Sequence, residues 1–335
     1  MKRSKAQPTI YDVAELSGLS IATVSRVLNS SELVNEATRS RVMAAIDQLG
    51  YVPKAEARAR ALKNSGRIGV ITPFFTAPSF VQRLRGVAAA LVGTGYELVV
   101  YTVESKDHLQ VYLATLPLTG SLDGLLVMSL EFGEAEARRL LDHGLETVLI
   151  EYPQPFFSCV GIDNIAGGRM AAEYLLGKGH RRCAFLGDTD LPEYSIHPVS
   201  LRLVGYRQGL SAAGVALPAE YIRLAPYSQE QARRVARQLL DLPAPPTAIF
   251  VATDLQAFGV MKAAREIGLK IPHDLAIIGF DDLDMADFIG LTTINQSLDA
   301  SGRIAVELLL ARLSDPGRAI QQVTIPLTIV ERETV

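Results

Sequence analysis

Residues 20–29, near the N-terminus, combine side chains that can contact a polyanion and read its bases. The guanidinium of Arg26 can donate two parallel hydrogen bonds to the edge of a guanine. Ile21 and Ala22 can offer only apolar contact, for example to the methyl group of thymine. Polar groups that can bond phosphates or cap helices are Thr9, Ser20, Thr23, Ser25 and Asn29. This set of side chains suits contact with double-stranded DNA, provided that a helix presents them on one face.

Two short helices are predicted to position this face. The first is expected over Ile10–Ser17 with Thr9 as its N-cap, and Gly18 can end it in a left-handed conformation. Ser20 then caps a second helix over Ile21–Leu28, whose Val24, Val27 and Leu28 should face a core. A third helix is expected from about Glu36 to Leu49. Helices joined by a glycine turn are the arrangement that places a second helix in the DNA major groove.

The charge distribution favours the same interpretation. The chain has 335 residues and a formal charge of −3. Residues 1–65 carry about +4, so the remaining residues carry about −7. A basic head on an acidic body is typical of a protein that binds nucleic acid through the head.

The segment Thr9–Asn29, TIYDVAELSGLSIATVSRVLN, resembles the DNA-binding headpiece of the lactose-repressor (LacI/GalR) family. The resemblance implies a transcriptional regulator, with repression as the favoured mode, that binds a near-palindromic operator as a homodimer. It also implies that a small effector controls the affinity for DNA. Dimerisation would use the helix after Phe80 and a helix of a second lobe.

Residues 54–65 are short, basic and alanine-rich, so a helix there would be marginal on its own. The segment is either a solvated linker or, as the resemblance implies, a hinge helix that orders on DNA. Arg60 stands where the family commonly has a leucine that wedges into the minor groove, and Leu62 follows two positions later. Either Leu62 takes the wedge role, or Arg60 enters the groove as a cation and reads its width.

From Arg67 onward, apolar strands alternate with amphipathic helices, which predicts an α/β fold with parallel sheets covered on both faces. The resemblance implies an effector domain like a periplasmic binding protein, with two doubly wound lobes after the all-α helix-turn-helix headpiece. Three crossovers are expected near 160–163, 289–293 and 320–325. The expected division is a headpiece over 1–53, a hinge over 54–65, and an effector-binding and dimerisation domain over 66–335. Lobe 1 would comprise 66–160 and 293–322, and lobe 2 would comprise 163–290 and 323–335.

Charged and aromatic residues gather where the predicted strands end, which is where parallel sheets bind ligands. They are Phe75, Thr76, Phe80, Asp163, Arg202, Tyr227, Asp254, Phe280 and Asp281. Carboxylates and a guanidinium can bond vicinal hydroxyls, and aromatic faces can cover a sugar ring. Asp254 and the neighbouring Asp282 could equally be helix N-caps. The resemblance implies effector contacts by Arg202 and Asp281, extending to Asp163, Asp254 and Gln296, with Phe80 and Tyr227 against the ligand.

The identity of the effector stays open. A mono- or disaccharide is favoured, with the aromatic residues inclining toward a disaccharide; a purine or nucleoside and a partner protein are the alternatives. A further alternative is a sugar-binding protein without a regulatory role. Such a protein would need an export signal and would have no use for the basic head. Two departures from the family pattern bear on this domain: Glu151-Tyr152 replaces a common Asp-Arg pair, and Gly290 stands where a proline is usual.

Other classes are disfavoured. No GxSxG, P-loop or HExxH motif occurs and the five histidines lack ligand spacing, so neither an enzyme nor a metal or cofactor site is expected. Cys159 and Cys183 lie in apolar runs and are expected to be buried free thiols. No signal peptide or membrane-spanning run is apparent, which predicts a cytoplasmic protein without a membrane partner.

Overall fold

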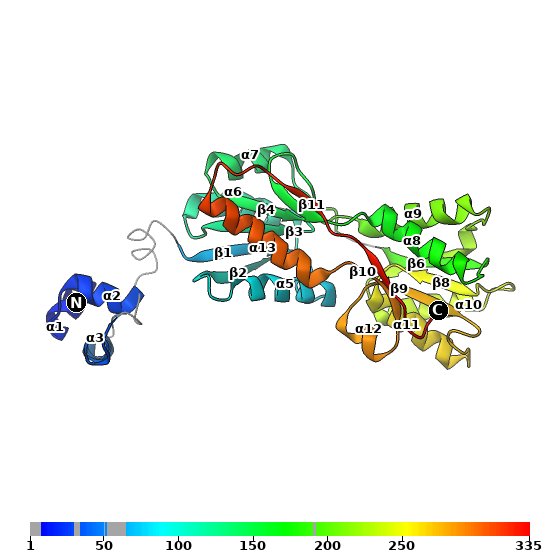
Figure 1. Ribbon diagram of the computed structural model, residues 1–335, viewed down its shortest axis with the longest axis horizontal. Helices are drawn as coiled ribbons and strands as arrows, with labels where there is room; N and C mark the ends of the chain where they lie inside the picture. The colour runs from blue at the N-terminus through cyan, green and yellow to red at the C-terminus, as the bar shows by residue number, and fades with distance from the viewer. Residues whose placement is uncertain (1–7, 30–33, 50, 52–64, 190–191) are drawn as a thin grey trace, which may run out of the picture. The chain divides into compact units, whose positions relative to one another are not determined.

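The computed structural model describes residues 8–29, 34–49, 51, 65–189 and 192–335, and it divides into two units, Met1–Ser65 and Gly66–Val335. Arg60 and Leu62, on which the hinge prediction depends, lie outside the described residues, as do the side chains of Leu28 and Asn29. Figure 1 shows the elements of each unit in chain order.

The N-terminal unit contains three helices, α1 (Ile10–Ser17), α2 (Ile21–Asn29) and α3 (Glu36–Leu49), at the predicted positions. The Asp12 carboxylate accepts hydrogen bonds from the backbone nitrogen and hydroxyl of Thr9, which starts α1. Gly18 ends α1 with a φ of 64°, a conformation that costs glycine little. The Ser20 hydroxyl accepts a bond of 3.1 Å from the backbone nitrogen of Thr23 and so caps α2.

A small apolar core holds the three helices together. Its fully buried members are Val13, Ala14, Val24, Val27, Val42 and Ala45. Arg41 of α3 also donates a hydrogen bond of 2.7 Å to the carbonyl of Ser17, one of the last carbonyls of α1. Because these contacts take up the inner faces of the helices, the outer face of α2 is left to solvent.

Lobe 1 of the second unit is a six-stranded parallel sheet. Its strands, in spatial order, are β11 (Gln322–Thr324), β5 (Ser158–Gly161), β4 (Glu146–Ile150), β3 (Gly124–Met128), β1 (Arg67–Thr72) and β2 (Glu97–Thr102). One face packs against α6 (Lys106–Thr119) and α7 (Glu134–Asp142), and the other against α5 (Pro78–Leu91) and α13 (Leu298–Ser314).

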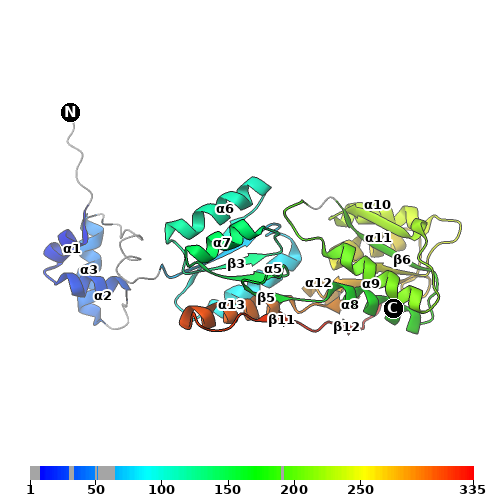
Figure 2. The same ribbon diagram turned by 90° about the horizontal axis from the view of Figure 1, so that it is seen from above.

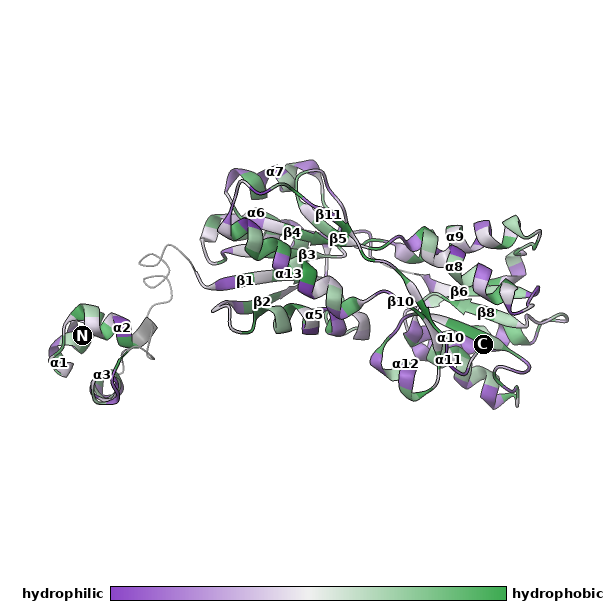
Figure 3. Ribbon diagram, in the orientation of Figure 1, coloured by the Kyte–Doolittle hydropathy of each residue, from purple (hydrophilic) through white to green (hydrophobic). Residues whose placement is uncertain are grey.

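Lobe 2 repeats this plan. Its sheet runs β12 (Thr328–Val330), β10 (Thr292–Asn295), β9 (Ala276–Asp281), β8 (Ala248–Val251), β6 (Cys183–Thr189) and β7 (Ile222–Pro226), with only β12 antiparallel. The helices α10 (Gln229–Leu240) and α11 (Asp254–Glu266) cover one face, and α8 (Asn164–Gly177) and α9 (Pro198–Ala212) cover the other. The short helix α12 (Asp284–Phe288) was not predicted. Figure 3 shows largely hydrophobic strands beneath helices of mixed hydropathy, as two covered sheets require.

The chain crosses between the lobes three times. The first crossing, between β5 and α8, lies where the sequence predicts it. The second lies at 296–297 and not at 289–293, because β10 pairs with β9 and so belongs to lobe 2. The third lies at 325–327, slightly after the predicted 320–325, and it splits the expected single strand VTIPLTIVER into β11 and β12. Figure 2 shows β11 leading toward β12 along one side of the unit.

Gly290 falls in the range 289–293 that was predicted as a crossover, but it is not in a crossover. It adopts a φ of 70° between α12 and β10, inside lobe 2. Its carbonyl accepts a hydrogen bond of 2.9 Å from the backbone nitrogen of Glu333.

Among the described residues, no helix has the length and apolar character to cross a membrane.

The helices α8 and α9 approach each other closely enough to fix the position of Arg202. A Cβ atom added at Gly168 would lie 1.9 Å from the carbonyl oxygen of Arg202. One added at Gly205 would lie 1.8 Å from the carbonyl oxygen of Ile165. Only glycine allows this backbone contact, so these two positions set where Arg202 enters the cleft between the lobes.

Candidate functional site

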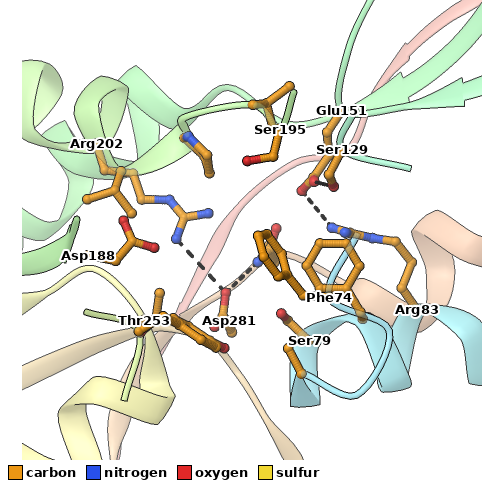
Figure 4. Close-up of a pocket in the computed structure, with 17 residues that line it drawn as sticks. Phe74, Ser79, Arg83, Ser129, Glu151, Asp188, Ser195, Arg202, Thr253 and Asp281 are labelled. Atoms are coloured by element: carbon orange, nitrogen blue, oxygen red, sulfur yellow. Dashed lines mark hydrogen bonds and ion pairs between the residues drawn. The ribbon is translucent and has the colours of Figure 1, made fainter. Parts of the chain in front are cut away.

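A cavity opens between the lobes at the carboxyl ends of both sheets. Its lining comes from the loops after the strands, from the first turns of α5 and α9, and from the second crossover. The lining residues are Phe74, Ala77, Ser79, Phe80, Arg83, Ser129, Glu151, Asp188, Ser195, Ile196, Pro198, Val199, Arg202, Tyr227, Thr253, Asp281 and Gln296. Figure 4 shows these side chains converging from the two lobes.

The wall of the cavity in lobe 1 is built on a buried ion pair. Arg83 of α5 donates a hydrogen bond of 2.6 Å to Glu151 and another of 2.9 Å to the hydroxyl of Ser301. The Ser129 hydroxyl donates to the second oxygen of Glu151. Burial opposes ionisation of Glu151, but the charge of Arg83 and the bond from Ser129 hold its pKa below the ordinary value. This carboxylate is therefore ionised and fully bonded within the protein.

The wall in lobe 2 centres on Arg202. Its guanidinium lies 3.6 Å from the centre of the Phe280 ring and donates bonds of 2.9 Å to Asn164 and 2.6 Å to the carbonyl of Ala252. Its distance to the carboxylate of Asp281 is 4.0 Å, long for a hydrogen bond. Burial raises the pKa of Asp281, and the nearby charge of Asp254 adds to this, although Arg202 opposes it.

Gln296 connects the cavity to the second crossover. Its side-chain nitrogen donates a hydrogen bond of 2.5 Å to Asp281, while its side-chain oxygen is buried without a partner among the described residues. The hydroxyl of Tyr227 is also buried without such a partner, and burial raises its pKa. Buried polar atoms of this kind are costly unless a ligand or water bonds them.

Backbone strain gathers at the same place. Of the five described non-glycine residues with positive φ, three line the cavity: Ser129 (54°), Glu151 (73°) and Asp281 (131°). Each such conformation costs on the order of 1–3 kcal/mol and persists only where the surroundings enforce it. The strain indicates that the polar groups are held in place before any ligand arrives.

The cavity collects five of the ten residues predicted to bind an effector: Phe80, Arg202, Tyr227, Asp281 and Gln296. Three others have surface or core positions outside it. Phe75 and Thr76 are exposed, although the neighbouring Phe74 lines the cavity. Phe280 is fully buried in the core of lobe 2 and touches the site only through the guanidinium of Arg202.

Asp163 and Asp254 lie outside the cavity lining and make hydrogen bonds within the protein, and their ligand contacts stay predictions. Asp163 is exposed and accepts a hydrogen bond of 2.9 Å from the backbone nitrogen of Ala166, which caps α8. Asp254 is fully buried and accepts bonds from the backbone nitrogen of Leu283 and the hydroxyl of Thr293. It is not an N-cap, because Thr253 caps α11.

Asp282, the other residue considered as an N-cap, does not cap α12 either. It bonds Asn295 at 2.8 Å and pairs with Arg332 at 2.9 Å. This network joins the ends of β9 and β10 next to the second crossover.

Sequence reasoning missed several lining residues. Glu151, Asp188 and Thr253 follow or end strands, so the strand-end rule could have found them. Arg83 lies inside α5 and carries no such signal. Ser195 and Ile196 lie in a loop of lobe 2 that reaches the cavity. Ser195 forms an antiparallel bridge with Leu130, which follows β3 of lobe 1 on the other side of the cleft.

The predicted recognition face on α2 is solvent-exposed. Ile21, Ala22 and Arg26 are exposed, and Arg26 makes no hydrogen bond or ion pair with any described residue. Thr9 and Ser20 are occupied at helix starts, and the hydroxyl of Thr23 contacts that of Ser20 at 2.9 Å. Within the described ranges, no group of three His, Cys, Asp or Glu side chains could hold a metal ion.

Comparisons with known proteins agree with this architecture. Residues 9–54 match the family described as bacterial regulatory proteins, lacI family, and residues 172–335 match a periplasmic binding protein-like domain. The ribose operon repressor of Escherichia coli K12 is 33% identical over 97% of this chain and 98% of its own length. Such relatives are transcriptional regulators and not enzymes.

Two solved structures extend the likeness to three dimensions. The lac repressor dimer bound to operator and the anti-inducer ONPF matches 98% of this chain and 99% of its own, with 29% identity and a TM-score of 0.79. A LacI family regulator from Enterococcus faecium with bound ribose matches 80% of this chain and 98% of its own, with 28% identity and a TM-score of 0.70. The chain therefore belongs to the lacI family of bacterial regulatory proteins, and it is a DNA-binding transcriptional regulator.

Proposed function

We propose that this regulator senses a neutral monosaccharide in the cavity between its lobes and represses transcription from a near-palindromic operator as a homodimer. The observation that carries the proposal is the lining of the cavity. Two guanidinium groups, three carboxylates and the rings of Phe74, Phe80 and Tyr227 surround one small space. Charged groups bond the hydroxyls of a sugar in pairs, and aromatic rings cover its apolar face.

The size of the cavity narrows the choice of sugar. The volume open to the centres of water molecules is about 110 Å³. This small volume favours a pentose or hexose over the disaccharide that the aromatic residues alone had favoured. The ribose bound in the Enterococcus faecium neighbour supports the same class.

The headpiece supplies the DNA contact. In the proposed complex α2 enters the major groove, with Ile21, Ala22 and Arg26 against base edges and the polar residues of Thr9 to Asn29 against phosphates. Arg26 is the base-reading residue, because its guanidinium is exposed and uncommitted among the described residues. A bidentate contact to guanine discriminates by about 1–3 kcal/mol against other bases.

The dimer and the coupling follow from surfaces on both lobes. Val81 of α5 in lobe 1 and Met285 and Phe288 of α12 in lobe 2 are exposed apolar side chains, which supports a self-association surface across both lobes. A sugar that bonds both walls stabilises one relative arrangement of the lobes. If DNA and the sugar favour different arrangements, binding of one lowers the affinity of the protein for the other, and the factor is the same in both directions.

The first experiment is a thermal-shift panel with D-ribose, D-glucose, cellobiose, adenine and adenosine. A ligand at 100 times its dissociation constant adds about 2.7 kcal/mol to the stability of the native state. We expect a monosaccharide to raise the unfolding temperature, and a response only to adenine or adenosine would overturn the sugar assignment.

A binding-site selection from random DNA duplexes then tests the headpiece. The selected duplex should be released by the sugar that the panel identifies. Arg26→Ala should lower affinity for the selected duplex more than for a random one. Equal loss on both would remove Arg26 from the base-reading role.

A further inference from the structure

The charged groups that face the cavity are unequally matched. Arg83 and Glu151 form a closed pair at 2.6 Å, so lobe 1 contributes no net charge. Lobe 2 contributes one guanidinium, Arg202, and two carboxylates, Asp188 and Asp281. One cation cannot neutralise two ionised carboxylates. Burial raises the pKa of Asp281 to about 8, so its carboxyl mostly holds a proton at neutral pH, and the ionised carboxylate of Asp188 balances the charge of Arg202.

Asp188 is the carboxylate without a bonded partner. It stands at the end of β6, where the neighbouring carbonyl of Gly187 accepts a hydrogen bond of 3.2 Å from Gln256. Apart from its own backbone N–H, its side chain has no hydrogen-bond or ion-pair partner among the described residues, although it lines the cavity. Figure 4 shows it beside the guanidinium of Arg202, without a dashed line to any neighbour.

The surroundings of Asp188 explain why an open carboxylate survives there. Arg202 and His197 come from the start of α9, and Tyr227 follows β7, so these are the charged or titratable groups that face it. Burial raises the pKa of Asp188 to about 6, and the charge of Arg202 limits the rise. At neutral pH the group is mostly ionised, and no other described residue donates a hydrogen bond to it.

We propose that Asp188 is a specificity-determining residue that accepts a hydrogen bond from a ligand hydroxyl and excludes anionic ligands such as phosphorylated sugars. The proposal rests on the proposed function and deepens it, since it names neutral polyols as the class that the cavity accepts. Two arginines in a cavity suggest an anion site at first sight. Here Glu151 pairs with Arg83, and the ionised carboxylate of Asp188 balances the charge of Arg202.

The test compares the full-length protein with Asp188→Asn by calorimetry, using D-ribose and D-ribose 5-phosphate as probes. Asp241→Asn is the matched control, because Asp241 is an exposed aspartate of lobe 2 that lies outside the cavity. We expect the unaltered protein to prefer ribose and Asp188→Asn to lose about 10- to 100-fold in ribose affinity, as for a hydrogen bond to a charged group. The preference for ribose over its phosphate should narrow by at least tenfold. Unchanged affinity and preference would overturn the proposal.

A second measurement keeps the test independent of the sugar. A carboxyl whose pKa is raised on folding costs stability above that pKa, and the cost fades as the pH falls through about 6. Ligand-free Asp188→Asn should therefore unfold a few degrees higher than the unaltered protein at pH 8, with a smaller gain at pH 5, because the cost disappears fully only below the ordinary pKa of 3.8. A lower unfolding temperature at pH 8 would show that Asp188 has a structural partner and would overturn the proposal.

The two measurements separate this proposal from the sugar assignment. If ribose and the other sugars do not bind the unaltered protein but Asp188→Asn is stabilised at pH 8, the sugar assignment fails and the open acceptor stands. If ribose binds and Asp188→Asn changes neither affinity nor preference, the sugar assignment stands and the role of Asp188 fails.

Discussion

The two walls of the cavity use the same chemical groups in opposite states. In lobe 1, Arg83 and Glu151 are 2.6 Å apart, and Ser129 and Ser301 complete their hydrogen bonds. In lobe 2, the closest approach of Arg202 to Asp281 is 4.0 Å, and Asp188 has no bonded partner among the described residues. The pKa of Glu151 is lowered in the first wall, whereas that of Asp281 is raised in the second.

This difference indicates that the lobe 1 wall is a framework, which holds the local structure, and that the lobe 2 wall is the receptor, which binds the ligand. A buried ion pair whose two carboxylate oxygens are both bonded gains less from a ligand than an open carboxylate does, and it serves mainly to hold the local structure. A wall with too few donors gains from each hydroxyl that a ligand brings. We therefore expect changes in lobe 1 to act mainly on stability and changes in lobe 2 to act mainly on ligand binding.

The largest expected effect is that of Arg202→Met on sugar affinity. The substitution removes the charged donor of the lobe 2 wall, so affinity for the sugar identified by thermal shift should fall by 100-fold or more. Calorimetry measures the loss, and Arg207→Met, an exposed arginine on the same helix, is the control. A loss below tenfold in a folded protein would contradict the receptor role of this wall.

The next effect sharpens the framework role of lobe 1. Arg83→Met and Glu151→Gln each leave one member of a buried pair alone, which typically costs about 3–5 kcal/mol of unfolding free energy. The double variant should lose much less than the two single losses together, because no unpaired charge remains. Urea unfolding of the four proteins gives the coupling, and additive losses would show that the pair does not act as a unit.

The smallest effect concerns an exposed link between the lobes. Arg85 of α5 bonds Asp284 of α12 at 2.5 Å and Asp299 of α13 at 2.6 Å, all at the surface. Exposed ion pairs contribute about 0–1 kcal/mol and are screened by salt. Arg85→Ala should change sugar affinity less than fivefold, with the change shrinking between 0.05 and 0.5 M salt. A larger, salt-independent change would mean that this link, and not the buried walls, controls closure.

The sequence determined those features that short-range interactions decide. Thr9, Gly18 and Ser20 act within one helical turn of their own positions, so the three headpiece helices were predictable from the chain alone. The alternation of strands and helices likewise revealed two covered sheets, and the ends of strands pointed to Arg202 and Asp281.

Only the tertiary structure decided which of these groups meet. Asp163 and Asp254 have the residue type and position of ligand contacts, yet one caps a helix and the other bonds inside lobe 2. Arg83 reaches the cavity from within a helix, and β10 joins lobe 2 by pairing with β9. Each of these outcomes depends on partners far away in the chain, and local sequence patterns carry no information about such partners.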